Sequence, residues 1–197
     1  MRLFLAIRPP RAVLDHLEPA LDGVRDRAGR ALRWTEPEQR HLTLAFHPEV
    51  PAGAVDDVVA VAGRIAAGHG PLDLHLAGAG EFSHRTLWVG VGGQVRELGA
   101  LLAEPWLADD DGRDRRRAHL TVARVSAAAP RPRCRRRGEP RPSAPSTVLL
   151  AEAVHALAVY RGPEWTADEV EVVASRLGEG RSGGPLHEVL ATVPLRG

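Results

Sequence analysis

A five-residue pattern occurs twice in this chain, with its two copies 78 positions apart: His41-Leu-Thr-Leu-Ala45 and His119-Leu-Thr-Val-Ala123. Both copies are rich in apolar and β-branched side chains, which favours a β-strand. Alternate residues of a strand point to the same face. Each copy therefore predicts a strand that presents an imidazole beside a hydroxyl, with their Cα atoms roughly 7 Å apart. Two such strands can face one ligand from opposite sides, so the repeat strongly constrains the fold.

Chance explains this repeat poorly. Nine His and seven Thr in 197 residues give about 0.3 His-x-Thr triplets by accident. The two copies also share the Leu between these residues and the Ala that closes the pattern. The alternative interpretation is a pair of ordinary strands whose His and Thr side chains are satisfied by their neighbours.

The composition is that of an ordinary globular protein, with 44% hydrophobic and 26% charged residues. A chain of this length can form one core, or two small lobes that share one. The single Cys134 excludes an internal disulfide and predicts a reducing compartment. The apolar start at residues 3–7 is too short for a signal peptide or a membrane span. We therefore expect a cytoplasmic protein with no membrane partner.

Positive charge is distributed unevenly along the chain. The net charge is only +1 and Lys does not occur, but residues 113–141 contain eleven Arg against two acidic residues. The planar Arg fork suits phosphate groups, which predicts a nucleic-acid partner. GC-rich codons would produce the same composition, and both interpretations remain open. Residues 126–146, rich in Pro, Arg, Ala and Ser, predict a mobile surface segment.

Hydrophobic periodicity predicts an α+β protein with one domain over residues 1–197. Besides the two motifs, the predicted strands are 2–7, 72–77, 86–91, 170–175 and 187–194. The predicted helices are 10–28, 51–65, 94–103 and 147–160. Gly162-Pro163 predicts a turn. Strands followed by helices occur in two similar halves with one motif each, so we expect a duplicated unit.

The two motifs carry residues suited to cleaving a phosphate ester. Such a reaction needs a base to activate the attacking oxygen and an acid to protonate the leaving oxygen, and imidazole suits both roles. His41 and His119 on opposite sides of a phosphorus atom would permit in-line displacement without a metal ion. The hydroxyls of Thr43 and Thr121 would donate to the non-bridging oxygens.

One further residue follows each Thr by three positions. Arg124 is a candidate for a charge-assisted contact to the phosphate, and Phe46 is a candidate for stacking on a base. The alternatives are a solvated surface position for Arg124 and a core position for Phe46. Phosphate-binding loops, dinucleotide-binding glycines and metal-ligand spacings are missing from the sequence. We therefore predict neither a metal ion nor a cofactor.

These residues resemble the two-histidine phosphoesterases, and most closely their bacterial RNA 2′,3′-cyclic phosphodiesterase branch, historically called 2′-5′ RNA ligases. The family pattern, His-x-Thr/Ser-x-x-aromatic and then His-x-Thr/Ser-x-x-Arg, is matched by residues 41–46 and 119–124. Residues 2–7, 86–90 and 175–195 support the resemblance. It implies a bilobal α+β fold with one motif from each lobe. Two antiparallel sheets would flank a central cleft, with helices on the outer faces.

The resemblance also implies an activity, the metal-independent hydrolysis of RNA 2′,3′-cyclic phosphate ends to 2′-phosphomonoesters, with 2′-5′ RNA ligation as a side activity. We expect a monomer. In the family the second histidine acts as base and the first as acid, which would assign these roles to His119 and His41. The sequence alone leaves the roles open.

Two alternatives also stay open, a two-histidine hydrolase of a small cyclic nucleotide and a non-catalytic RNA- or nucleotide-binding module. The chain departs from the family pattern at His47-Pro48, where Leu-Gly is usual, and at residues 115–118, where an aromatic residue and Pro often stand. These changes leave the length and base preference of the substrate open.

Overall fold

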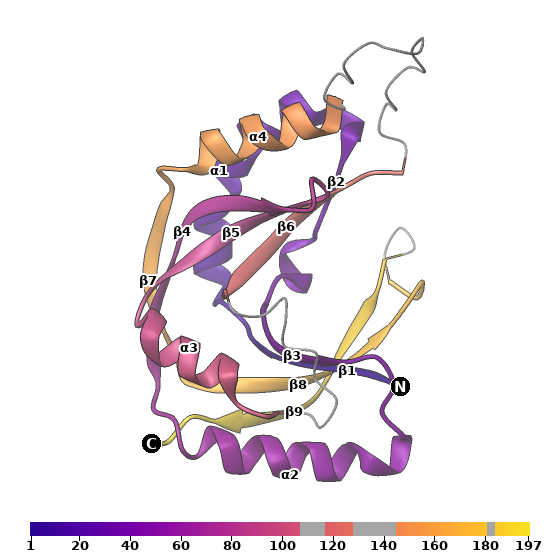
Figure 1. Cartoon of the computed structure of the whole chain (residues 1–197), viewed down its shortest axis with the longest axis vertical. Coiled ribbons are helices and arrows are strands. Elements are labelled where there is room, and N and C mark those ends of the chain that lie inside the picture. Colours follow the sequence, from indigo (N-terminus) through magenta and orange to yellow (C-terminus); the bar gives the residue numbers. More distant parts are fainter. Residues whose placement is uncertain (107–116, 128–144, 181–183) are drawn as a thin grey trace, which may run out of the picture.

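A strongly curled sheet dominates the fold (Figure 1). The structure is a computed structural model, and it describes residues 1–106, 117–127, 145–180 and 184–197. In chain order its helices and strands are β1 (Arg2–Ile7), α1 (Arg11–Ala28), β2 (Leu32–Trp34), β3 (Leu42–His47), α2 (Val55–Ala66), β4 (Leu72–Phe82), β5 (Thr86–Gly93), α3 (Val95–Ala103), β6 (His119–Val125), α4 (Pro145–Leu157), β7 (Arg161–Ala167), β8 (Glu169–Arg176) and β9 (Leu186–Pro194). The mixed α and β character predicted from the sequence is confirmed.

The nine described strands form one sheet in the order β7-β4-β5-β6-β3-β1-β8-β9, and β2 also pairs with β6. The strand pairs are antiparallel. At the centre, β3 and β6 are joined only by the pair Leu42 and Leu120. The expectation of two separate sheets is therefore corrected. The two motif strands meet edge to edge for one residue pair and then diverge, so the sheet is continuous but bent.

The bend divides the sheet into a first half, β1, β3, β8 and β9, and a second half, β2, β4, β5, β6 and β7. Each half carries one motif strand, and the two halves curl toward each other (Figure 1). The first half combines strands from the beginning and the end of the chain. The halves of the sheet are thus not the halves of the sequence, and the predicted duplication remains a prediction.

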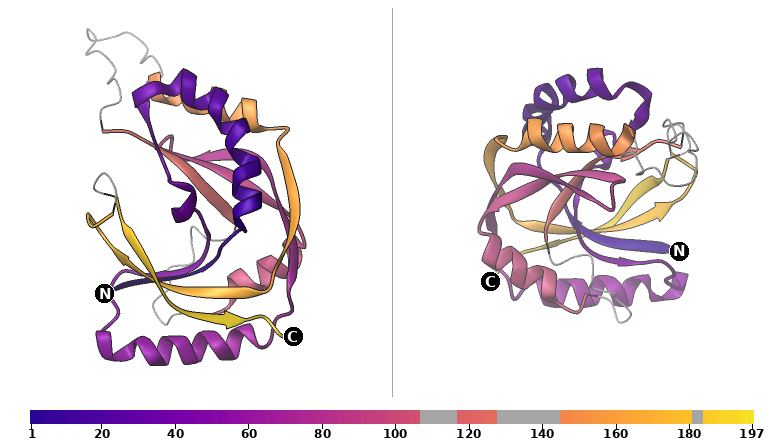
Figure 2. Two further views of the ribbon diagram at one scale, coloured as in Figure 1. Left: turned by 180° about the vertical axis from the view of Figure 1, so that it is seen from behind. Right: turned by 45° about the horizontal axis from the view of Figure 1, so that its top comes forward.

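Helices cover the outer faces of the sheet. Helices α1 and α4 lie side by side outside the second half, and α2 lies along the first half (Figures 1 and 2). Helix α1 buries apolar residues at helical spacing: Val13, Leu14, Leu17, Leu21 and Val24. This apolar stripe packs against the core, as the periodicity predicts. None of the helices in the described part of the chain is both long and apolar enough to span a membrane.

One predicted turn is a strand. Gly162 and Pro163 lie inside β7, an edge strand that pairs with β4. Pro has no N–H to donate, so within a sheet it is tolerated at an edge where no partner needs that donor. Residues 128–144 of the predicted mobile segment 126–146 lie outside the described residues, as do most of the arginines in 113–141, and the last two residues of the segment begin helix α4.

Candidate active site

A cleft of about 630 Å³ lies between the two halves of the sheet. Side chains from both motif strands line it, together with residues from β1, β2, β8 and β9. The structure brings all six site residues predicted from the sequence to this one cleft: His41, Thr43, Phe46, His119, Thr121 and Arg124.

Each motif strand contains a β-bulge, and both bulges fall on the fourth residue of the motif. In β3, the register against β1 skips Leu44. In β6, the register against β5 skips Val122. The extra residue shifts the alternation of side chains by one position. As a result Leu44 and Val122 are fully buried, and so are the residues that follow them, Ala45 and Ala123.

The two bulges explain why the third residue after each Thr lines the cleft. In a regular strand Phe46 would point away from Thr43, because side chains separated by an odd number of positions face opposite sides. The bulge in β3 places Phe46 on the same face as Thr43. The bulge in β6 places Arg124 on the same face as Thr121. The spacing of the sequence motif thus reflects a bulge in each strand.

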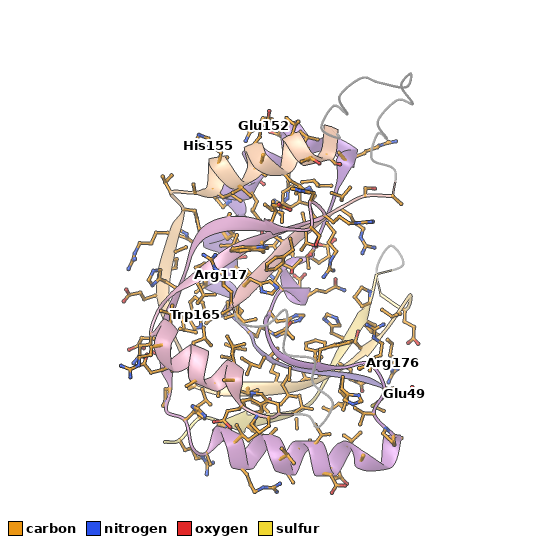
Figure 3. The ribbon with its side chains drawn as sticks, viewed as in Figure 1. Glu49, Arg117, Glu152, His155, Trp165 and Arg176 are labelled. Carbon is orange, nitrogen blue, oxygen red and sulfur yellow. The ribbon has the colours of Figure 1, made fainter. Side chains whose placement is uncertain are left out.

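The two histidines are oriented in the same way. His41 Nδ1 lies 2.8 Å from the carbonyl oxygen of Gln39, and His119 Nδ1 lies 3.0 Å from that of Arg117. Figure 3 shows Arg117 beside the start of β6, inside the curve of the sheet. Because a carbonyl oxygen only accepts, Nδ1 donates in both rings. In the neutral ring Nε2 is then unprotonated, so it can accept a proton from water, and in the charged ring it can donate one.

The surroundings of the two rings differ. His41 stacks on Phe4, with ring centroids 4.4 Å apart and planes inclined by 18°. His119 meets the ring of Phe82 edge-on at 4.8 Å and lies 6.2 Å from Trp88. Each imidazole is therefore held by aromatic neighbours from its own half of the sheet, which limits its rotation.

Burial controls the charge of His41. Desolvation lowers the pKa of His41 to about 3. The hydrogen bond to the Gln39 carbonyl opposes this shift, whereas the positive charge of His187 in its protonated form and the charges of Arg8 and Arg124 add to it. With no anion in the cleft, His41 is neutral at pH 7.

The charged residues that line the cleft within the described chain are mostly basic, with Arg2, Arg33 and Arg124 against Glu36. Arg33 and Arg124 are paired across β2 and β6, and neither forms an ion pair with the described residues. Burial, together with the positive charge of Arg33, lowers the pKa of Arg124. Two neighbouring guanidinium groups that form no ion pair with a described carboxylate favour an anionic ligand.

The structure places both Phe46 and Arg124 at the wall of the cleft. Phe46 is half-buried at the cleft wall, and the Arg2 guanidinium lies 5.0 Å from the centre of its ring. The side chain of Arg124 opens into the cleft, whose walls cover part of it. Their contacts to a base and to a phosphate remain predictions.

A third histidine in the cleft was missed by the sequence analysis. His187 of β9 lies with its ring 5.4 Å from that of His41 and 4.9 Å from that of Phe4. His187 belongs to no motif. The sequence predicts strand β9 but does not indicate that this strand lies beside His41. The only available signal was a histidine at one end of a predicted strand.

A buried arginine anchors the approach to the first motif. Arg40 precedes His41, is 1% exposed, and donates from Nη1 to the carboxylate of Glu18 in α1. Its Nε donates to the carbonyl oxygen of Thr35 at 3.0 Å. The ion pair ties β3 to helix α1 at the residue next to the catalytic candidate. Sequence reasoning missed this pair, because its members are 22 positions apart and belong to no motif.

Within the described ranges, no group of three or more His, Cys, Asp or Glu side chains is arranged to hold a metal ion. The metal-independent reaction remains a prediction.

Comparisons with known proteins show a similarity in sequence over part of the chain and a similarity in fold over all of it. Residues 7–88 match the family described as LigT like Phosphoesterase. An RNA 2′,3′-cyclic phosphodiesterase of Geobacillus stearothermophilus is 35% identical over 99 residues, which cover 46% of this chain and 32% of the relative. Another, from Methanothermobacter thermautotrophicus, is 30% identical over 95 residues, covering 46% and 51%. The matches thus span about a third and about half of the length of these relatives.

Solved structures show the same fold over the entire chain. The protein TT0787 of Thermus thermophilus has a TM-score of 0.69 at 26% identity, covering 100% of this chain and 99% of the other. E. coli LigT in complex with 3′-AMP has a TM-score of 0.64 at 23% identity, covering 100% and 98%. The resemblance predicted from the two motifs is confirmed as a similarity: residues 7–88 match the LigT-like phosphoesterases in sequence, and the whole chain has the fold of TT0787 and of E. coli LigT.

Proposed function

We propose that this protein hydrolyses RNA 2′,3′-cyclic phosphate ends to 2′-phosphomonoesters, without a metal ion, using His41 and His119 as the acid–base pair. The observation that carries this proposal is the equivalence of the two motifs in one cleft. Each contributes a histidine whose Nδ1 is held by the carbonyl two residues earlier, and each has a bulge at the same position. The names of the two curated relatives support the choice of substrate.

The chemistry is an in-line displacement at phosphorus. One imidazole Nε2 takes a proton from water as the new P–O bond forms. The other gives a proton to the 3′ oxygen as the P–O3′ bond breaks, which leaves the 2′-phosphomonoester. Thr43, Thr121 and Arg124 donate to the non-bridging oxygens, where negative charge increases in the transition state.

The direct test is incubation of the protein with an oligoribonucleotide that ends in a 2′,3′-cyclic phosphate, in the presence of EDTA. We expect complete conversion to the 2′-phosphate, identified by mass and by comparison with authentic 2′- and 3′-phosphates. Conversion of ADP-ribose cyclic phosphate but not of the RNA would favour the small-nucleotide hydrolase. Binding of the RNA without turnover would favour the binding module.

The low pKa of His41 makes anion binding dependent on pH. For the acid role, His41 must gain a proton when the phosphate binds, since an adjacent anion raises the pKa of an imidazole. Between the low pKa of the unliganded protein and the higher pKa of the complex, the complex holds more protons, so affinity rises as the pH falls. We expect sulfate, which does not titrate in this range, to bind more tightly at pH 6 than at pH 8.

Calorimetry in buffers of different ionisation enthalpy measures the proton uptake directly. His41→Asn is the control, because its amide cannot be protonated in this range. Uptake that is lost in this variant belongs to His41 and supports its acid role. Uptake that is unchanged in the variant would show that His41 stays neutral, which contradicts the acid role and assigns the base role to it.

A further inference from the structure

His187 lies in the cleft beside the first catalytic candidate. Its strand β9 pairs with β8, where His187 is opposite Ser175, and both residues line the cleft. The rings of Phe4, His41 and His187 contact one another, with centroid separations of 4.4, 4.9 and 5.4 Å. The third histidine is thus part of the same wall as His41, although it comes from the opposite end of the chain.

The protonation of His187 follows from its surroundings. Its Nδ1 is buried and has no hydrogen-bond partner among the described residues. A proton on that nitrogen would be an unsatisfied buried donor, which is unfavourable. Burial lowers the pKa of His187, and the positive charge of Arg8 adds to the shift. The ring is therefore neutral near pH 7, and because His187 lines the cleft with Nδ1 buried, we assign its proton to the other nitrogen, Nε2.

We propose that His187 is a third ligand-binding histidine of this site, which donates a hydrogen bond from Nε2 to an oxygen of the bound phosphate group. The identity of that group as an RNA terminal phosphate rests on the function proposed above, but the donor role toward a tetrahedral oxyanion does not. His41 and His187 then present complementary atoms in the resting protein. Nε2 of His41 is an acceptor and Nε2 of His187 is a donor.

Gln39 forms hydrogen bonds both to His41 and to the segment that precedes His187. Its carbonyl accepts the hydrogen bond from His41 Nδ1, and its side-chain Nε2 donates to the carbonyl of Pro185 at 2.7 Å, two residues before His187. The β8–β9 connection is closed nearby by a hydrogen bond of 2.9 Å from the Gly180 N–H to the Gly184 carbonyl. The start of β9 is therefore tied to the segment that orients His41.

Amide side chains of different length can test the proposed donor. A Gln amide reaches about as far as imidazole Nε2, whereas an Asn amide reaches about as far as Nδ1, and Phe keeps the ring without a donor. The experiment compares His187→Gln, His187→Asn and His187→Phe with the wild type. His155→Gln, on the exposed face of α4 outside the cleft (Figure 3), is the matched control. The measurements are kcat/KM on the cyclic-phosphate RNA and the affinity for inorganic sulfate.

We expect His187→Gln to stay within about threefold of the wild type in both measurements. His187→Asn and His187→Phe should lose about tenfold or more, the factor for one hydrogen bond to a charged group. A Phe variant equal to the wild type would show that the ring only packs, and a Gln variant as weak as Phe would exclude the donor. If the wild type does not hydrolyse the RNA, the proposed function fails, but the sulfate series still tests His187.

Discussion

Replacement of His41 or His119 by Ala is expected to lower kcat/KM on RNA 2′,3′-cyclic phosphate ends by at least about 100-fold. Each variant removes the group that either takes the proton from water or gives one to the leaving oxygen, and such a group typically contributes a factor of 10² to 10⁴. The kcat/KM of the double variant should be only slightly lower than that of the less active single variant, because the two histidines act in one step. Steady-state kinetics in EDTA measure the effect.

Two controls separate lost chemistry from lost structure. His41 stacks on Phe4, so His41→Ala also leaves a space in the cleft wall, and His41→Asn is the less disruptive companion. His155→Ala on the exposed face of α4 should leave the rate unchanged. Rates within a few-fold of the wild type for His41→Asn or His119→Ala, in folded protein, would contradict the acid–base assignment.

Replacement of Glu18 by Ala is expected to lower the free energy of unfolding by about 3 kcal/mol. The Arg40 guanidinium is buried and donates to this carboxylate, and its Nη2 already lacks a partner among the described residues. Removal of one member of a buried ion pair leaves an uncompensated charge, which typically costs about 3–5 kcal/mol. We expect the lower end of this range because Glu18 keeps some contact with solvent. Urea unfolding at pH 7 measures the change.

The same pair predicts a loss of stability in acid. Burial alone would raise the pKa of Glu18, but hydrogen bonds from Arg40 and Arg25 outweigh it, so the pKa is lowered in the folded state. The contribution is complete above the pKa of the unfolded chain, about 4.3, and is lost as the pH falls through the folded-state pKa. Glu18→Gln should remove this part of the pH dependence. The double variant Glu18→Met with Arg40→Met should be more stable than Glu18→Ala, because it leaves no unpaired charge.

An outcome in which Glu18→Ala costs less than about 0.5 kcal/mol would place the pair among ordinary surface ion pairs. The activity of the same variant carries separate information. Arg40 directly precedes His41, so a displaced Arg40 should lower kcat more than it raises KM. Inactivity with unchanged stability would show that the pair acts on the site rather than on the fold.

Local patterns in the sequence determined most of the elements of this fold. The apolar spacing of α1, from Val13 to Val24, produces a helix wherever one face can be buried, and the alternation of the motif strands produces β-structure on either side of the bend. The two His-x-Thr motifs also identified the candidate site, because a strand places His41 and Thr43 on one face regardless of what surrounds them. These features depend on neighbours within a few positions.

Local sequence patterns do not predict which distant strands pair with each other. Gly162-Pro163 is typical of a turn, but its place at the sheet edge makes a strand possible there. The bulges at Leu44 and Val122 exist only relative to their partner strands. The pairing of Leu42 with Leu120 connects the two expected sheets into one continuous sheet.

The sequence by itself thus determined the two motif histidines and their neighbouring threonines, and the tertiary structure added a third histidine and set the charge of the first. His187 joins the cleft only because β9 pairs with β8 and so lies beside His41. The pKa of His41 falls to about 3 because residues from other elements bury its ring. Desolvation and long-range pairing depend on the spatial neighbours of a residue, which local sequence patterns do not specify.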